Sequence, residues 1–229
     1  MVGDFLIFAV IIVFVSLLVF FVEFRGSDKP VEWPQANIGV GQIESFSVTG
    51  KPDKKGYYTV IMQMAVEAQD GSHFKSVLTR QLPEHKHSLL QQGILVPVMY
   101  RPDRPEKVKI ARGRHEKRAQ DFLNQVKIRD GILDREMLEA DLRGRPTYSQ
   151  VKYIKDTGRK VRGLNEYELG LSLFPAHGEP YSVTKTMVLM NYEAAAVTPG
   201  TILPTRYLPN QPNALVVSLR PKNEKADAK

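Results

Sequence analysis

Cysteine is absent from this 229-residue chain, and tryptophan occurs once. Without a thiol the protein has no disulfide framework, no thiolate metal site and no cysteine nucleophile. The sequence also lacks the G-x-S-x-G, Walker, Rossmann and H-E-x-x-H patterns of nucleophilic, phosphate-binding, dinucleotide and zinc chemistry. An enzyme is therefore the class that the sequence supports least, and we expect no catalytic residues and no cofactor.

Histidine is rare in the sequence, and its one cluster has too few candidate ligands to bind a metal ion. Glu84, His85 and His87 stand close together, but no third strong ligand follows at a useful spacing. Solvated polar residues on a short helix explain the cluster, and surface or loop positions explain the other three histidines. We expect no metal site.

One long apolar run stands near the start of the sequence. Residues 5–22 are apolar except for Ser16, and with Glu23 and Phe24 a helix here would be about 30 Å long at ~1.5 Å per residue, enough to cross a bilayer. A secretory signal peptide needs a basic start and a small-x-small cleavage site, and neither is present. A buried core helix is the other alternative, but nothing else in the chain is apolar enough to surround it. We predict that residues 1–29 form an uncleaved transmembrane anchor and its juxtamembrane segment.

The charges beside this run indicate its orientation. No Lys or Arg precedes it, whereas Arg25 and Lys29 follow it. The positive-inside rule therefore places the C-terminal part in the cytoplasm. Two charges are a small difference, so a periplasmic C-terminal part stays the alternative.

The most informative pattern is a repeat. The motif G-x-x-x-P-x-x-Y-x-P-x-x-P occurs twice without a gap, at Gly93, Pro97, Tyr100, Pro102 and Pro105 and again at Gly200, Pro204, Tyr207, Pro209 and Pro212. The same offset relates the alternating set of Val60, Met62, Met64 and Val66 to Tyr167, Leu169, Leu171 and Leu173. Nearer the module start the offset slips by one residue, because Thr49-Gly50 corresponds to Thr157-Gly158. A repeat of this kind predicts two copies of one fold.

Each copy has the pattern of three strands, a short helical segment and two further strands. In the first copy, residues 30–112, we expect strands over 42–48, 57–68, 74–82, 94–100 and 107–111 and a helical segment over 84–92. The second copy covers residues 147–219. This order fits a small barrel of the oligonucleotide-binding type and equally another five-stranded β-roll.

A helical connector, residues 113–146, joins the two copies. Ala119, Phe122, Leu123 and Val126 have the spacing of one helix face, Asp130-Gly131 interrupts it, and a second helix should begin after Asp134 as N-cap. We expect these helices to cover the open face of one or both barrels; a docking surface for a partner helix is the alternative. Residues 220–229 are charged and are predicted to be a disordered tail. The predicted fold class is mainly β, with a transmembrane helix and two duplicated five-stranded modules.

Proline inside both predicted fourth strands indicates sheet edges. Pro97 and Pro204 cannot donate to a ladder, so we expect these strands to be edges or to carry a bulge. An edge strand can pair with a strand of another protein. The residues that we predict for such contact are Ile94, Val96, Val98, Ile202 and Leu203.

The formal net charge is +7, and basic residues gather between Arg101 and Arg129. Those that could contact an anionic surface are Arg101, Arg104, Lys107, Lys109, Arg112, Arg114, Lys117 and Arg118. Single-stranded nucleic acid would also need exposed aromatic side chains for base stacking, and only Tyr100 and Phe122 are near, where core packing explains them. Anionic lipid is therefore favoured over nucleic acid, with solubility as the simpler explanation of the charge.

The second copy resembles a bacterial β-domain. The resemblance lies in D-T-G-x-x-V-R-G-x-x-x-Y-E-L-x-L-x-L from Asp156, H-G-E-P-Y-S-V-T from His177 and V-T-P-G-T-x-L-P-T-R-Y-L-P-N-Q-P from Val197. These stretches are similar to domain-of-unknown-function family 3592, from which the first copy departs by its charges at Lys54-Lys55 and by Gln69-Asp70. The resemblance implies a bacterial protein with small β-domains beside transmembrane helices, and it implies no catalytic residues.

Together these patterns predict a single-pass scaffold or accessory subunit of a bacterial inner-membrane protein assembly, without catalytic activity. Its partners would be other subunits of that assembly and membrane lipid. The alternative is a module that binds anionic lipid or single-stranded nucleic acid at the membrane.

Overall fold

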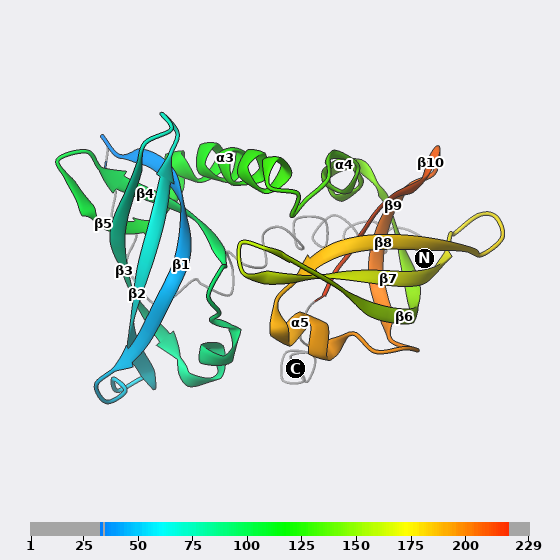
Figure 1. Ribbon diagram of the computed structural model, residues 1–229, viewed down its shortest axis with the longest axis horizontal. Helices are drawn as coiled ribbons and strands as arrows, with labels where there is room; N and C mark the ends of the chain where they lie inside the picture. The colour runs from blue at the N-terminus through cyan, green and yellow to red at the C-terminus, as the bar shows by residue number, and fades with distance from the viewer. Residues whose placement is uncertain (1–32, 34, 220–229) are drawn as a thin grey trace, which may run out of the picture. The chain divides into compact units, whose positions relative to one another are not determined.

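The computed structural model describes residue 33 and residues 35–219 (Figure 1). The anchor predicted over 5–22 and the tail predicted over 220–229 lie outside these residues. Within the described ranges, no helix has the length and apolar character needed to cross a membrane. The chain divides into two compact units. In the described part, the first unit contains the residues up to 132 together with 160–164, and the second contains 133–159 and 165–219.

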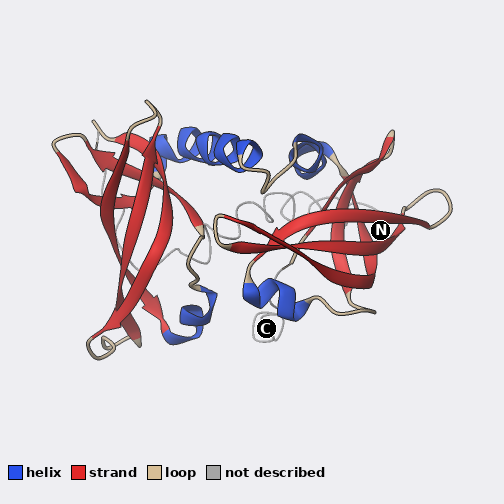
Figure 2. Cartoon of the chain, in the orientation of Figure 1, coloured by secondary structure: helices blue, strands red, loops and turns tan. Residues whose placement is uncertain are grey.

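The first unit is a closed five-stranded barrel. Its strands are β1 Asn37–Thr49, β2 Tyr57–Ala68, β3 His73–Pro83, β4 Leu95–Arg101 and β5 Arg104–Ile110. They follow the order β1-β2-β3-β5-β4, and β4 returns to β1. Figure 2 shows the strands of both units in red and the helices in blue. All pairs are antiparallel except the short parallel pair of β3 with β5. Val60, Met62 and Met64, which alternate along β2, are all buried inside the barrel.

Short helices cover parts of this barrel. The 3-10 helix η1, Glu84–Leu89, lies between β3 and β4, and η2, Gly113–His115, leads into helix α3, Glu116–Arg129. The buried residues of α3 are Ala119, Leu123 and Val126, at the predicted spacing. Ala119 packs in a cluster with Ile38 and Met99, and Leu123 and Val126 pack with Val40 and Leu95. Helix α3 therefore covers the outer face of β4 and of the first half of β1, so both faces are buried there.

The second unit is an open five-stranded sheet. Its elements are α4 Arg135–Arg143, β6 Arg145–Val161, β7 Leu164–Phe174, β8 Tyr181–Leu189, α5 Asn191–Ala196, β9 Ile202–Leu208 and β10 Gln211–Val217. The strand order is β10-β9-β6-β7-β8. Asp134 is the N-cap of α4, as the sequence predicts, and its carboxylate accepts a hydrogen bond from Met137 N at 2.5 Å. The tip of the β6–β7 hairpin belongs to the first unit.

The two units are copies of one topology. Opening the barrel between β3 and β5 gives β5-β4-β1-β2-β3, which is the order of the second sheet. Individual hydrogen bonds also recur: Gly93 N donates to Ile43 O at 2.9 Å, and Gly200 N donates to Val151 O at 2.8 Å. Ile43 and Val151 are related by the slipped offset, which places the extra residue of the first copy in the loop between β1 and β2. The predicted duplication is confirmed.

The prediction that β4 and β9 are sheet edges is wrong; as for its alternative, a bulge, the structure shows register shifts in the β4–β5 and β9–β10 pairs. Strand β4 lies between β1 and β5, and β9 lies between β6 and β10, so the edges of the open sheet are β8 and β10. In a strand, the N–H and C=O of one residue point to the same neighbour. Pro97 O accepts from Ala111 N at 3.1 Å, and Pro204 O accepts from Ser218 N at 2.8 Å, each just past the end of the last strand. The missing proline N–H therefore falls where a ladder ends, and an interior strand tolerates it.

The copies differ at the seam that closes the barrel. In the first unit Leu78 pairs with Val108 across the parallel β3–β5 contact. The counterpart of Leu78 in β8 is Lys185, which is buried and lies 3.3 Å from an Asp134 carboxylate oxygen. Closing this seam would place an ammonium group in an apolar interior, which is costly. The open sheet instead keeps Lys185 beside the acidic start of α4.

Candidate functional site

The basic residues predicted to contact an anionic surface come from the β4–β5 hairpin and the start of α3. Arg101, Arg104 and Lys107 are exposed on the hairpin. The Arg101 guanidinium is paired with the Asp103 carboxylate, and this hydrogen bond lowers the pKa of Asp103 below its ordinary value. An anion at the hairpin would therefore compete with Asp103 for Arg101.

The remaining members of the basic group are partly engaged within the first unit. The Lys109 ammonium nitrogen lies 5.0 Å from the centre of the Trp33 ring, at cation–π distance. Arg118 donates to Gln69 Oε1 at 3.0 Å. Arg112 is half-buried, whereas the remaining two, Arg114 and Lys117, are exposed. This is a solvated basic surface of long side chains, which attracts anions by charge without fixing one geometry.

The aromatic residues near this surface belong to the core, as the sequence predicts. Tyr100 is buried, and its ring packs edge-on against Phe74 with 4.9 Å between ring centroids. Phe122 packs against the two apolar clusters under α3. Neither ring is placed to stack on a nucleic-acid base.

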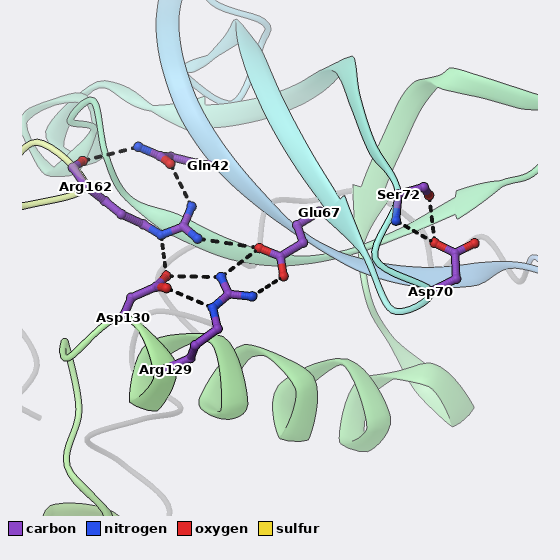
Figure 3. A network of polar contacts seen from close by, with 7 residues as sticks. All are labelled: Gln42, Glu67, Asp70, Ser72, Arg129, Asp130 and Arg162. Carbon is purple, nitrogen blue, oxygen red and sulfur yellow. Dashed lines mark hydrogen bonds and ion pairs between the residues drawn. The ribbon is translucent and has the colours of Figure 1, made fainter.

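The first unit contains a polar network of two arginines, two carboxylates and one amide (Figure 3). Arg129 donates to both carboxylate oxygens of Glu67, at 2.9 Å for Nη2 to Oε2, and its Nε lies 3.0 Å from Asp130 Oδ1. Arg162 Nε contacts the other Asp130 oxygen, and its Nη2 lies 3.5 Å from Glu67 Oε2. Gln42 completes the network, because its Oε1 accepts from Arg162 Nη1 at 2.9 Å.

The charges of this network balance, and the ionised forms are favoured. The hydrogen bond from Arg129 is the largest influence on Glu67 and lowers the pKa of that carboxyl, with Arg162 acting in the same direction. Burial raises the pKa of Asp130, but hydrogen bonds from Arg129 and Arg162 outweigh it, and the net pKa lies below the ordinary value. Both carboxylates are therefore held ionised and paired, an arrangement that stabilises structure rather than one poised for proton transfer.

Local backbone geometry brings Arg162 into this network. Arg162 and Gly163 form the two-residue turn of the β6–β7 hairpin, with φ of 51° and 86°, values typical of the turns that join paired strands. A Cβ on Gly93 would lie 2.4 Å from Arg162 O, so glycine there permits the close approach. No local pattern in the sequence indicates this network, because Gln42, Glu67 and Arg162 are far apart along the chain.

The histidine cluster is not brought together with further ligands. His87 Nε2 lies 3.4 Å from Leu82 O, and its ring packs edge-on against Tyr58. His115 is buried, in contrast to the surface position expected, with Nε2 3.2 Å from Trp33 O. Across residues 33 and 35–219, no group of three or more His, Cys, Asp or Glu is arranged to hold a metal ion.

The residues predicted for edge-strand contact lie in two environments. Ile94, Val96, Val98 and Leu203 are buried, because both neighbouring strands and the core cover them. Ile202 is 54% exposed on the outer side of β9. A comparison with protein-family models finds no match for this chain, and a search of curated proteins finds no significant relative.

Proposed function

We propose that this chain is a single-pass, membrane-anchored scaffold or accessory subunit of a bacterial membrane protein assembly, and that it is not an enzyme. The observation that carries the proposal is the exposure of large apolar side chains on the sheet of the second unit. Tyr148 is 61% exposed, Ile202 54% and Phe174 42%. Gathered apolar exposure is typical of surfaces that bind another protein. The apolar run over residues 5–22 would hold this surface at a membrane.

The polar chemistry of the first unit supports a binding role over a catalytic one. The carboxylates of Glu67 and Asp130 are committed to arginine partners. A general acid or base needs a carboxyl that can exchange its proton near the working pH, whereas these two pKa values are lowered. The network therefore fits a stabilising role in a scaffold. The resemblance to family 3592 stays a prediction that agrees with this role.

Purification from native membranes tests the scaffold proposal. The full chain is extracted in mild detergent after brief crosslinking, and we expect a stoichiometric companion subunit. Recovery of a lone monomer with intrinsic hydrolase or nucleic-acid-binding activity would overturn the proposal.

For orientation, we propose that the C-terminal part faces the cytoplasm of the inner membrane, from Arg25 and Lys29. Protease added to intact spheroplasts should then leave residues 30–229 uncut. Digestion that spares a cytoplasmic control protein would reverse the orientation and place this part in the periplasm.

A second candidate function, contact with anionic lipid, is favoured by the exposed charges of Arg104, Lys107 and Lys117. A version of the chain without residues 1–29 should float with anionic vesicles at low salt and lose them at high salt. Arg104→Glu with Lys107→Glu should weaken flotation more than the matched change of Lys54 and Lys55 to Glu in the exposed β1–β2 loop. Equal flotation with neutral vesicles would refute the candidate, and a preference for single-stranded nucleic acid would favour that ligand instead.

A further inference from the structure

The two copies of the module differ in whether a helix covers the outer face of the sheet. In the first unit, Val40 and Leu95 lie under α3 on the outer face of β1 and β4. Strand pairing identifies their counterparts: Val40 lies opposite Pro97 and Leu95 opposite Gln42, just as Tyr148 lies opposite Pro204 and Ile202 opposite Gln150. Tyr148 and Ile202 therefore occupy the positions in the second unit that α3 covers in the first.

Exposure confirms that these positions are uncovered. Val40 and Leu95 are 2% and 6% exposed, whereas Tyr148 and Ile202 expose more than half of their surface. Helix α4 packs against β10 and against the far end of β9, where Gly144 O and Ala140 O accept from Arg206 at 2.6 and 3.4 Å. Arg206 is the counterpart of Met99, so α4 leaves the half of the face around Tyr148 and Ile202 bare.

The bare part extends across a third strand. In the first unit Val40 lies opposite Glu67, which forms the ion pair with Arg129 of α3. The counterpart of Glu67 is Phe174, and the Thr147 hydroxyl donates to Phe174 O, which places the end of β7 beside the start of β6. The bare face, which we define as Phe174, Tyr148, Pro204 and Ile202, therefore runs over β7, β6 and β9, and all four residues are exposed.

We infer that the bare face binds an amphipathic helix from another subunit, in the way that α3 lies on the first copy. The first unit supplies the precedent, because the same fold binds a helix through apolar residues at i, i+4 and i+7, namely Ala119, Leu123 and Val126. Helix α3 itself is packed in the first unit, so the occupant comes from elsewhere. The inference rests on the proposed scaffold function, whose partner surface it names.

The chemistry of the face defines the partner helix further. Phe174 replaces Glu67, so the position that corresponds to Arg129 of α3 is apolar in the partner. Lys152, an exposed basic residue, follows Tyr148 on β6. Acidic residues at the margin of the helix would complement it. The predicted partner is thus a helix with a continuous apolar stripe and an acidic margin.

A peptide from this chain serves as the probe. A fluorescent peptide of residues 115–130 with Arg129→Leu, Arg118→Glu and Lys127→Glu presents the α3 stripe, an apolar residue for Phe174 and acidic margins. We expect saturable binding to the full chain in detergent, weakened at least tenfold by Tyr148→Asp. The control Phe46→Asp, which changes another exposed aromatic residue in the first unit, should leave binding unchanged. Absence of saturable binding, or equal binding by Tyr148→Asp, would overturn the inference.

Two further measurements distinguish a partner helix from the other possible occupants of the bare face. If the wild-type chain is a dimer in detergent that Tyr148→Asp dissociates, a second copy occupies the face and the inference is wrong. If removal of residues 1–32 is required before the peptide binds, the chain's own N-terminal segment occupies it, with the same consequence. In native membranes, a companion that is retained by Tyr148→Asp would overturn this site alone. A wild-type chain without any companion would overturn the proposed function itself.

Discussion

Replacing Glu67 by glutamine would measure how much the arginine–carboxylate network stabilises the first unit. Glu67 is 9% exposed, and its carboxylate contacts both Arg129 and Arg162. Glutamine keeps the shape but removes the charge, and it turns an NH2 group toward a guanidinium. Two arginine charges would then face the single carboxylate of Asp130.

The magnitude follows from exposure. A hydrogen bond to a charged group contributes about 1.5–3 kcal/mol, and removing one partner of a buried pair costs more than that. The Arg129 side chain is 53% exposed and can be solvated instead, which reduces the loss. We expect Glu67→Gln to lower the free energy of unfolding of the first unit by about 2 kcal/mol. Glu44→Gln, which removes an exposed pair with Lys75, should cost less than about 0.5 kcal/mol.

The assay uses the single tryptophan. Trp33 packs in an apolar cluster of the first unit, so its fluorescence during urea unfolding of the full chain in detergent follows that unit. The folded-state pKa of Glu67 is lowered, so its contribution is present above the unfolded pKa of 4.5 and is lost as the pH falls through the folded value. The difference between wild type and Glu67→Gln should therefore be complete at neutral pH and shrink in acid. A difference that stays constant with pH, or one no larger than that of Glu44→Gln, would refute the reasoning.

Three substitutions test local geometry. Gly93→Ala adds a Cβ 2.4 Å from a backbone carbonyl at φ +93° and should cost more than about 2 kcal/mol in urea unfolding, whereas Gly56→Ala, at φ +79° in open space, should cost about 1 kcal/mol. Gly170→Ala places its Cβ 2.2 Å from the Tyr153 ring and should destabilise the second unit by about 1–3 kcal/mol; failure of an added Tyr153→Ala change to recover part of this loss, measured by circular dichroism, would contradict the explanation. Asp134→Ala removes the N-cap of α4 and a partner of a buried lysine, whereas asparagine can still act as a cap. Asp134→Ala should therefore destabilise the second unit more than Asp134→Asn does, by an N-cap contribution of about 1 kcal/mol. Its lower melting temperature would show this.

Signals that lie close together in the sequence predicted their structures well. The alternating residues of β2 give the strand bounds Tyr57–Ala68 that the structure shows, and Asp134 caps α4 because its side chain needs only the next turn of the same helix. The repeat predicted one topology twice because glycine and proline fix the same turns and ladder ends in both copies.

Features that depend on the pairing of distant residues could not be predicted from the sequence. The effect of Pro97 on its strand depends on where β5 ends, which no local pattern reports, and so the edge-strand prediction failed. The contacts of Arg162 with Glu67 and Asp130 join residues far apart along the chain. The bare face emerged only from a comparison of the two copies in space, although the replacement of Val40 by Tyr148 is visible once the slipped offset is applied.

Photo-crosslinking in native membranes tests most directly whether the second unit binds another protein. A photoreactive amino acid is placed at Tyr148 of the full chain, and in a parallel chain at Phe46, which is also exposed but lies in the first unit. We expect position 148 to crosslink to a single other polypeptide, at a helix with apolar residues at i, i+4 and i+7, and position 46 to give no such product. No crosslink at position 148, or the same products from both positions, would contradict the claim that this face is where the scaffold holds its partner.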